Sequence, residues 1–427
     1  MELLEKILSR DNLNEAYKRV YANKGAGGVD GVTVDELLEY LKEHKVQLLS
    51  DIRTRKYRPQ PVRRVEIPKD NGKKRQLGIP TVVDRVIQQA IAQVLTPIYE
   101  EQFSNSSYGF RPNRSCEMAI IRSLELINDG YGWIVDIDLE RFFDTVHHDR
   151  LMNIIHRTIK DSDVLSLIRK FLASGVMVSG IYEETPIGTP QGGNLSPLLS
   201  NIMLNELDKE LETRGLHFVR YADDCKIFLG SQKAAERVMR SVTDFIERKL
   251  GLKVNATKSK IGRPNKIKFL GFGYFVDSNG VYQAKPHKDS IVKLKRKLKA
   301  LTRRSWGISL DVRLKKLKQQ IVGWVHYFRI AKMKSVLLDI DMKLRKRIRV
   351  VIWKQWKKTR KRYEALRKLG ATHRNAYVTA NSRKSYQYVC GTATIHATIT
   401  NQRLENRGLI SLSTLYAKVH LVIPATS

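Results

Sequence analysis

Four aspartates in two short apolar segments have the spacing that metal-dependent phosphoryl transfer requires. Asp136 and Asp138 lie in WIVDIDL at 133–139, a strand-like segment in which residues two apart share one face. Asp223 and Asp224 lie between FVRY and CKIFL, in the expected turn of a hairpin. Gathered carboxylates repel one another unless cations neutralise them, and Mg²⁺ prefers carboxylate oxygens and leaves room for substrate phosphates. Two such ions roughly 3.5–4 Å apart can clamp the attacking and leaving oxygens of a phosphoryl transfer.

Either segment taken alone is better explained by solvated strand-end or turn aspartates, since short motifs often match by chance. The two segments occur, however, in a chain with 77 Lys and Arg against 43 Asp and Glu, a net charge of +34. Such an excess favours a large polyanionic partner, although it says little about the fold. The aspartates and the charge together favour a metal-dependent enzyme that acts on nucleic acid.

The composition excludes several other classes of protein. No apolar run approaches the roughly 20 residues of a membrane span, so an anionic membrane is a poorer partner than nucleic acid. The start, MELLEKILSRDN, mixes acids with apolar positions and does not form a signal peptide. The scattered cysteines exclude a disulfide framework or a paired-cysteine zinc site: Cys116, Cys225 and Cys390. We therefore expect a cytoplasmic protein with no membrane partner.

Charge divides the 427 residues, a length sufficient for two or three domains. Residues 1–284 carry mixed charge, whereas residues 285–368 hold 29 Lys and Arg against 5 Asp and Glu. After Gly370 the chain becomes rich in Thr, Ser and Asn and loses its helical periodicity. We therefore place domain boundaries near 284 and 362.

The first part of the chain predicts an α+β arrangement with few strands and many helices. RRVEIP and KRQLGIP flank an Asn-Gly turn and predict a β-hairpin. Strands are also expected at 133–139 and within 217–229, and Ser196 is expected to cap a helix at 197–213. Further helices are expected around 2–9, 12–22, 34–55 and 82–98.

Apolar residues in the basic region recur three or four apart and predict three packed helices with their cations outside. A cation-rich helix face is ordinarily only solvated, but this concentration favours contact with nucleic-acid phosphates. The three apolar stripes are Ile291, Leu294, Leu298 and Leu301; Leu314, Leu317, Ile321 and Trp324; and Leu344, Ile348, Ile352 and Trp356.

The two aspartate segments resemble the catalytic motifs of reverse transcriptases. YADD at 221–224 resembles the signature turn of that family, and IVDIDLERFFD at 134–144 resembles its first catalytic strand. The resemblance implies that Asp138 and Asp223 bind metal. It also makes Asp224 the second turn carboxylate, which ligates metal or supports the site.

The choice of ligand in the first strand depends on the residues that follow it. The carbonyl oxygen of Leu139 is a further candidate ligand. Asp136 remains an alternative to Asp138, since both share a face. Asp138 is preferred because Phe143 follows it by five residues, the spacing at which the family places the aromatic side chain that excludes ribonucleotides.

Three other segments resemble the family's nucleotide site. Lys69 and Arg75 stand in the hairpin where the family grips the incoming triphosphate, and both side chains suit phosphate. Gln191 in GTPQGGNLSP corresponds to the family's contact with the nucleotide, and the glycines there permit close backbone approach. Lys258 in NATKSK corresponds to a lysine near the phosphates, a candidate proton donor to the leaving pyrophosphate.

SYGFRPNRS and KFLGF resemble group II intron reverse transcriptases more than retroviral ones. In the first, Arg111 and Arg114 either touch the template or brace the palm. The N-terminal helices and the NKGAGGVDG loop match that family's extension, whose loop lies over the template. IVGWVHYF resembles the maturase thumb motif, and its Trp324 and Tyr327 are expected in the core.

The resemblance implies contacts between the basic helices and RNA, with Lys315, Lys318, Arg345 and Arg349 as candidates. In this family the position of 363–427 holds a DNA-binding region, followed in some members by a Cys/His endonuclease. Cys390 stands alone there, which matches the compact bacterial class-C members that lack the endonuclease.

The fold expected from this resemblance is α+β, a right-hand fingers–palm polymerase with an all-helical thumb and a small basic C-terminal domain. Fingers and palm would occupy 1–284, with an N-terminal extension over about 1–60, the thumb 285–362, and the C-terminal region 363–427. The expected activity is RNA-directed DNA polymerisation with two Mg²⁺ ions, for which Mn²⁺ can substitute, together with maturase activity. Expected partners are group II intron RNA, an RNA template with a DNA primer, deoxynucleoside triphosphates and target DNA.

Two alternatives remain open at this point. The chain could be an RNA-binding splicing cofactor with a vestigial polymerase site, or an RNA-dependent RNA polymerase with a similar palm. Phe143 argues against the second, because a bulky ring beneath the ribose excludes a 2′-hydroxyl.

Overall fold

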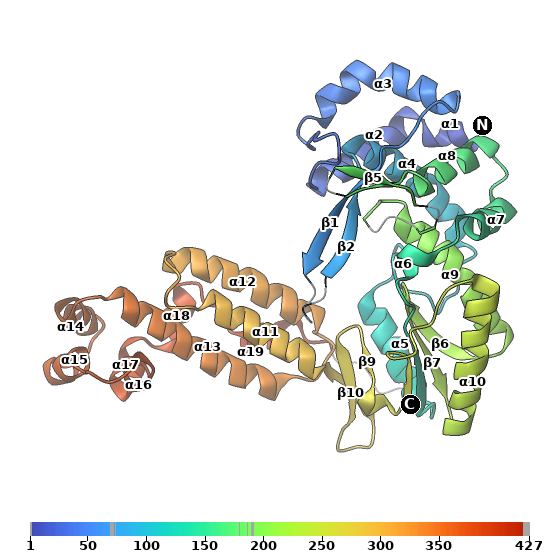
Figure 1. Ribbon diagram of the computed structural model, residues 1–427. Coiled ribbons are helices and arrows are strands. Elements are labelled where there is room, and N and C mark those ends of the chain that lie inside the picture. Colours follow the sequence, from blue (N-terminus) through green and yellow to red (C-terminus); the bar gives the residue numbers. More distant parts are fainter. Residues whose placement is uncertain are drawn as a thin grey trace. The chain divides into compact units, whose positions relative to one another are not determined.

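The structure is a computed structural model that describes residues 2–68, 72, 74–178, 180–185, 187–188 and 192–421 (Figure 1). Contacts divide the chain into two compact units, Met1–Arg263 and Pro264–Ser427. This division falls earlier than the charge boundary at 284, because the strands that follow Pro264 pack with the helices after them. The Tyr327 hydroxyl, for example, donates to the Leu270 carbonyl oxygen over 2.9 Å. None of the described helices is long and apolar enough to cross a membrane.

The first unit combines many helices with short strands, as the α+β pattern predicts. Its helices are α1 (Leu3–Ile7), α2 (Arg10–Ala22), α3 (Leu37–Arg53), α4 (Val82–Glu100), α5 (Cys116–Asn128), α6 (Phe142–Thr145), α7 (His148–Thr158), α8 (Ser162–Leu172), α9 (Ser196–Thr213) and α10 (Gln232–Phe245), the last continued by the π-helical turn η1 (Ile246–Leu250). Its strands are β1 (Val62–Pro68), β2 (Lys74–Ile79), β3 (Trp133–Ile137), β4 (Val176–Val178), β5 (Ile181–Glu183), β6 (His217–Tyr221), β7 (Asp224–Leu229) and β8 (Lys260–Gly262).

Two four-stranded sheets organise this unit. The predicted hairpin is confirmed: β1 and β2 pair antiparallel from Arg63↔Ile79 to Pro68↔Lys74, within a sheet ordered β2-β1-β4-β5. The second sheet is ordered β6-β7-β3-β8, so β3 lies between β7 and β8. This second sheet carries the two aspartate segments on neighbouring strands, although they are far apart in the sequence.

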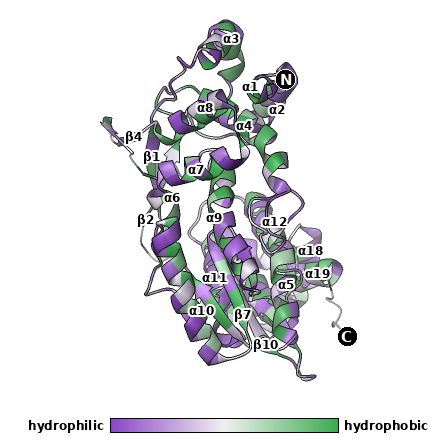
Figure 2. Ribbon diagram, turned by 90° about the vertical axis from the view of Figure 1, so that its right-hand side faces the viewer, coloured by the Kyte–Doolittle hydropathy of each residue, from purple (hydrophilic) through white to green (hydrophobic). Residues whose placement is uncertain are grey.

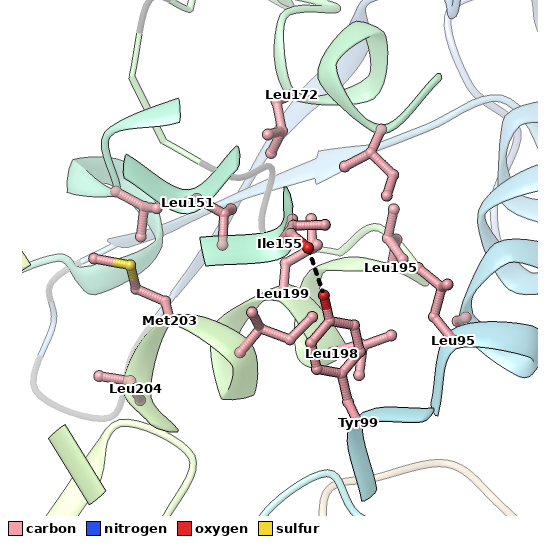
Figure 3. Packing of buried hydrophobic residues seen from close by; sticks show 14 of the residues in the cluster. Leu95, Tyr99, Leu151, Ile155, Leu172, Leu195, Leu198, Leu199, Met203 and Leu204 are labelled. Carbon is pink, nitrogen blue, oxygen red and sulfur yellow. Dashed lines mark hydrogen bonds between the residues drawn. The ribbon is translucent and has the colours of Figure 1, made fainter. Parts of the chain in front are cut away.

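Helices packed against one another form the core of the first unit. Side chains from α4, α7 and α9 interdigitate there, and the Tyr99 hydroxyl donates to the Ile155 carbonyl oxygen over 3.3 Å (Figure 3). Helix α9 begins at Ser196 with Leu195 at its N-cap position, so the predicted capping role of Ser196 is wrong by one residue. Because helix ends are set by the local fit of the chain, such a shift is common.

The second unit begins with a three-stranded sheet and continues as helices. The sheet has the order β11-β10-β9 and consists of β9 (Lys268–Phe269), β10 (Phe272–Val276) and β11 (Tyr282–Pro286), after the 3₁₀ turn η2 (Pro264–Lys266). The long helices are α11 (Lys288–Leu301), α12 (Leu310–Tyr327) and α13 (Lys334–Gln355). Hydrophilic and hydrophobic residues occur along the same helices (Figure 2). The centre of each predicted apolar stripe is buried: Leu294 and Leu298; Leu314, Leu317 and Ile321; Leu344, Ile348 and Ile352.

The last part of the chain is helical, although its sequence lacks a strong helical period. Its helices are α14 (Thr359–Lys368), α15 (His373–Ala380), α16 (Tyr386–Val389), α17 (Ala393–Thr398), α18 (Asn401–Asn406) and α19 (Leu412–Val419). Several are capped by hydroxyl side chains such as Thr372 and Ser385, which accept bonds from backbone amides. Helices this short show little periodicity, so the Ser/Thr-rich composition reflects capping rather than the absence of helix.

Candidate active site

The four aspartates lie at one end of the second sheet. Asp136 is in β3, Asp138 follows the end of that strand, and Asp223 occupies the two-residue turn between β6 and β7. Asp224, predicted to lie in the turn, is instead the first residue of β7 and pairs with Tyr221. Asp136 pairs with Lys226, and the ladder between β3 and β7 ends at Ile137↔Cys225, one residue before Asp138. Opposite residues and residues two apart in a ladder share a face, so Asp136, Lys226 and Asp224 lie on the same side of the sheet.

A buried lysine joins two of these carboxylates. Lys226 is 2% exposed; its ammonium donates to Asp136 Oδ1 over 2.6 Å and also to Asp224 Oδ1. Burial lowers the pKa of Lys226, but the carboxylates of Asp224 and Asp136 raise it more, and the pKa stays above its ordinary value. The carboxylate of Asp136 is therefore an internal partner of Lys226, which favours Asp138 as the ligand on this strand. The sequence signal for Lys226 is its position two residues after Asp224, in an otherwise apolar strand.

An exposed lysine holds Asp138. Lys258 Nζ lies 3.0 Å from Oδ1 and 3.3 Å from Oδ2 of Asp138, and the Lys258 side chain is 65% exposed. The backbone of Asp138 is fixed by Asn255, whose amide donates to the Asp138 carbonyl oxygen over 2.8 Å, and by the Ser259 hydroxyl. Lys258 was expected near substrate phosphates; without substrate it pairs with this carboxylate.

The oxygen donors fit a hard divalent cation in type, but they are not gathered into one cluster. Within the described ranges, no group of three or more His, Cys, Asp and Glu side chains is placed to hold a metal. The predicted set of Asp138, Leu139, Asp223 and Asp224 is thus not assembled here, because Lys226 and Lys258 hold two of its carboxylates. Leu139 forms an isolated antiparallel bridge with Val254. The hydrogen bonds of this bridge join Glu140 to Lys253 and Asn255 to Asp138, so the Leu139 carbonyl oxygen takes no part in them.

A pocket of about 170 Å³ lies within the first unit, lined mainly by residues of β1 and β2 and of the segment that follows β3. Phe143 in α6 lines it, and its ring contacts Phe142 edge-on with the centroids 5.2 Å apart. Arg64 of β1 and Arg141 also line the pocket; the sequence reasoning missed both. The remaining lining residues are Val62, Gln76, Leu77, Gly78, Asp144, Val176, Thr185, Ile187 and Gly188.

Three predicted nucleotide contacts cannot be placed in this pocket. Lys69 and Gln191 lie outside the described residues, and Arg75 lies in β2 with a side chain that is not described.

Gly188 shows why the loop before α9 needs glycine. It has a left-handed φ of +98°, and a Cβ there would lie 3.1 Å from the carbonyl oxygens of Phe143 and Asp144.

A buried hydrogen-bond network around Arg220 supports the turn that carries Asp223. Arg220 is fully buried and donates from Nε to Asp208 Oδ1 over 2.7 Å, and from Nη1 to the Ala222 carbonyl oxygen over 2.9 Å. Ala222 has a left-handed φ of +56°, a strained conformation for a residue with a Cβ. Gly109 packs against this turn so closely that a Cβ would lie 2.3 Å from the Ala222 amide nitrogen. Sequence motifs indicated the turn but not its support.

Arg111 braces the palm in this structure. Its side chain is 3% exposed, donates to Glu100 over 2.6 Å, and also binds the carbonyl oxygens of Ser104 and Ser107. Of the two roles left open for this residue, the geometry therefore favours bracing over template contact. Arg114 is partly exposed, donates to Asn105, and lies over the ring of Tyr108.

The predicted RNA contacts of the basic helices divide into exposed and buried residues. Lys315 and Lys318 are exposed on α12. Arg345 pairs with Glu405 at 3.2 Å and is partly exposed. Arg349 is 3% exposed and donates to the Ile399 carbonyl oxygen and to Asn401, so its predicted role as an RNA contact is wrong. The reason is that α13 packs against α16 and α19, and this packing buries positions that a cation count assigns to the surface.

The motif IVGWVHYF is less buried than expected. Trp324 is partly buried and its ring lies 4.6 Å from that of Phe328, a contact typical of a core residue. Tyr327 is 46% exposed, so its expected place in the core is wrong. Its hydroxyl instead joins α12 to the sheet of the second unit through Leu270.

Comparison with known proteins follows the same division of the chain. Residues 67–274 match the family model of the reverse transcriptases (RNA-dependent DNA polymerases), and residues 291–370 match that of the group II intron maturase-specific domain. The carboxylate strands and all the residues that line the pocket except Val62 and Arg64 lie in the first match, and α12, α13 and most of α11 lie in the second.

Several curated proteins are similar over much of the chain. Protein YkfC of Escherichia coli K12 is 36% identical over 311 residues, which are 63% of this chain and 81% of YkfC. The group II intron-encoded protein LtrA of Lactococcus lactis subsp. cremoris is 42% identical over 205 residues, 48% of this chain and 34% of LtrA. The putative COX1/OXI3 intron 2 protein of Saccharomyces cerevisiae is 31% identical over 319 residues, 60% of this chain and 37% of that protein. The aligned part thus spans about a third of the length of the last two.

A solved structure of telomerase from Candida albicans with a fragment of telomeric RNA aligns with a TM-score of 0.44 at 14% identity. The alignment covers 72% of this chain and 62% of that one, and a score of this size carries no argument.

The fold and the site define a reverse transcriptase with fingers and palm, a class of RNA-directed DNA polymerase whose members generally use divalent metal ions. The chain belongs to the group II intron-encoded proteins of this class, which also carry a maturase domain. The predicted family, fold class and kind of enzyme are confirmed.

Proposed function

We propose that this chain adds deoxynucleotides to a primer 3′-hydroxyl, copies group II intron RNA into DNA, and uses two Mg²⁺ ions, for which Mn²⁺ can substitute. The observation that carries the proposal is that neighbouring strands of one sheet bring the segment of Asp136 and Asp138 beside the turn of Asp223 and Asp224. Phe143, five residues after Asp138, lines a pocket in the same unit. Bound to Asp138 and Asp223, divalent metal would supply the positive charge that phosphoryl transfer requires. The nucleophile and the leaving group belong to the substrates, so the protein contributes mainly positioning.

The residues of the pocket divide the work of binding a nucleotide. Arg64 and Arg141 present guanidinium groups that suit a triphosphate, since each can donate two parallel hydrogen bonds. Phe143 fills the space that a 2′-hydroxyl would occupy and so selects deoxynucleotides. Were metal bound to Asp138, Lys258 would leave that carboxylate, and its ammonium could then neutralise substrate phosphate. Lys69, Arg75 and Gln191 remain predicted contacts with the same nucleotide.

We also propose that the second unit binds folded intron RNA and thereby assists splicing. It contains a pocket of about 470 Å³ lined by Arg303, Arg304 and Arg347 and by Tyr386 of α16, with no carboxylate among its lining residues. The cations of Lys354 and Arg362 lie over the ring of the same tyrosine. In the described part of the chain, none of these five cations forms an ion pair with a carboxylate. Arg347 and Arg362 donate to protein oxygens, whereas Arg303, Arg304 and Lys354 are exposed and available to phosphates.

Binding folded RNA more tightly than unfolded RNA would shift the folding equilibrium without any chemical step. Exposed Lys315 and Lys318 on α12 extend the cationic surface.

Target DNA is a further proposed partner, and a cytoplasmic location in a bacterial cell is proposed from composition and family alone. The oligomeric state is left open.

Primer extension on an RNA template, with each nucleotide type in turn and with Mg²⁺ or Mn²⁺, tests the polymerase proposal. We expect DNA synthesis by the parent protein and none by Asp223→Asn. If the parent extends no primer but stimulates intron splicing, the chain is a splicing cofactor with a vestigial polymerase site. Asp223→Asn should still stimulate splicing; its failure to do so while it binds the intron would show that the two functions share a site.

A further inference from the structure

We infer that Lys226 is a positioning residue of the polymerase site, and that it keeps Asp224 and Asp136 as an ion-paired structural cluster apart from the metal. Metal is then held by Asp138 and Asp223, and Asp224 supports the turn without ligating. This inference rests on the proposed polymerase function, and it separates carboxylates that a motif alone treats as one set.

The position of Lys226 makes its pairing permanent. It lies inside β7, between β6 and β3, opposite Val219 and Asp136 in the ladder. Its side chain is 3% exposed, and its ammonium lies 2.6 Å from Asp136 Oδ1 and also contacts Asp224 Oδ1. To leave this place the ammonium would have to break the sheet or cross its apolar packing, so it stays with its two carboxylates in every folded state of the palm.

Lys258 shows the opposite arrangement on the adjacent carboxylate. Its side chain is 65% exposed and reaches Asp138 from a turn, so a short rotation into solvent releases it. A divalent cation can therefore replace Lys258 on Asp138. The Asp224 side chain is itself 37% exposed, but the ammonium on its Oδ1 is buried and has no other place to go, so a divalent cation would meet that charge there.

Electrostatic repulsion also favours metal binding to Asp138 and Asp223 over binding to Asp224. A divalent ion that bound Asp224 would approach a buried ammonium within a few ångströms, and like charges repel most strongly where water is excluded. Asp223 lies in the turn itself, whereas the ammonium of Lys226 donates to Asp136 and Asp224. Lys226 therefore directs metal toward Asp138 and Asp223. It also holds Asp224, the first residue of β7, in place beside the turn.

The test measures metal binding directly as well as activity. Mn²⁺ binding to the full chain, without nucleotide, is followed by electron paramagnetic resonance for the parent, Asp223→Asn, Asp224→Asn and Lys226→Met. We expect Asp223→Asn to weaken Mn²⁺ binding at least tenfold and Asp224→Asn to change it less than threefold. Lys226→Met frees two carboxylates and should strengthen Mn²⁺ binding or add a bound ion, and Lys226→Met with Asp224→Asn should lose that gain.

Lys260→Met is the matched control, because Lys260 stands opposite Asp136 on the other neighbouring strand and is exposed. It should leave Mn²⁺ binding unchanged. Lys226→Arg keeps the charge and should retain the parent's metal affinity. In primer extension, Asp224→Asn should lower kcat and leave the Mg²⁺ concentration for half-maximal rate within threefold of the parent value.

Equal losses of Mn²⁺ affinity in Asp223→Asn and Asp224→Asn would overturn the inference, and this comparison decides the matter even if Lys226→Met does not fold. A folded Lys226→Met with parental Mn²⁺ binding would overturn it as well. If the expected binding pattern appears but the parent extends no primer, the polymerase proposal fails and the assignment of the carboxylates stands.

Discussion

The guanidinium of Arg220 donates to both carboxylate oxygens of Asp208, with 2.7 Å between Nε and Oδ1, and neither side chain has more than 1% of its surface exposed. The same guanidinium reaches the carbonyl oxygen of Ala222. The ion pair therefore joins helix α9 to the turn that presents Asp223. A buried pair of this kind specifies geometry, because breaking it leaves a charge without a partner.

Arg220→Met keeps the length of the side chain but leaves Asp208 buried and unpaired. We expect the free energy of unfolding to fall by about 3–5 kcal/mol, measured by urea denaturation. Arg19→Met is the control, because the Arg19–Glu15 pair is about half exposed and should cost less than about 1 kcal/mol. Equal effects of the two substitutions would show that the buried pair does not stabilise the turn.

Lys258→Met removes the ammonium that competes with metal for Asp138. The Mg²⁺ concentration for half-maximal primer extension should therefore fall, by roughly threefold, since an exposed ion pair is worth less than about 1 kcal/mol. Lys253→Met removes an exposed lysine that pairs with Glu140 instead, and it should leave the Mg²⁺ requirement unchanged. A higher Mg²⁺ requirement in Lys258→Met would mean that this lysine assists metal binding rather than opposing it.

Phe143→Val removes the ring that lines the pocket beside Arg141. The ratio of kcat/KM for deoxynucleotides to that for ribonucleotides should fall by at least roughly tenfold, the usual scale for steric discrimination by one group. Phe142→Leu alters the neighbouring ring, which is 2% exposed and belongs to the core, and should change stability more than sugar choice. An unchanged ratio in Phe143→Val would place the sugar gate elsewhere and reopen the choice between Asp136 and Asp138.

Asp84 predicts a pH dependence of stability. Burial raises its pKa from 3.8 to about 6, although hydrogen bonds from Tyr57, Thr81 and Gln60 lower it. The folded state therefore binds the proton more tightly than the unfolded state. Protonation of Asp84 stabilises the fold at low pH, and this contribution is lost as the pH rises through about 6.

Asp84→Asn is neutral at every pH and serves as the reference for this effect. The stability of the parent relative to Asp84→Asn should rise by up to about 3 kcal/mol as the pH falls from about 8 to about 4. Acid effects on all other groups are common to both proteins and cancel in the difference. A difference that does not vary with pH would show that Asp84 titrates normally.

Arg303→Gln with Arg304→Gln tests the cationic pocket of the second unit. Each phosphate contact that is lost should reduce the slope of log affinity against log salt by about 0.7–0.9, so the pair should reduce it by up to about 1.8. Arg360→Gln is the control, because Arg360 is exposed but paired with Glu364. Binding of intron RNA is measured between about 50 and 200 mM salt, and parallel plots for the double variant and the parent would exclude the pocket as an RNA site.

Much of the fold was predictable because its signals are local. The hairpin follows from Asn-Gly between alternating segments, and the three basic helices follow from apolar residues at helical spacing. The terminal helices α15–α19 were missed because each is too short to show a period. Ser196 was misplaced by one residue because a helix end depends on the fit of the whole loop before it.

The sequence by itself determined the family, since the order and spacing of its motifs carry that information, and it predicts Asp138 and Asp223 as metal ligands and Phe143 as the sugar gate. Only the tertiary structure decided which cations face solvent and which are buried. Lys226, Arg220 and Arg349 have the same residue types as the surface cations, but strands and helices distant in sequence enclose them. Burial of a charge depends on these long-range neighbours, because the free energy of desolvation must be offset by partners that the local sequence does not contain.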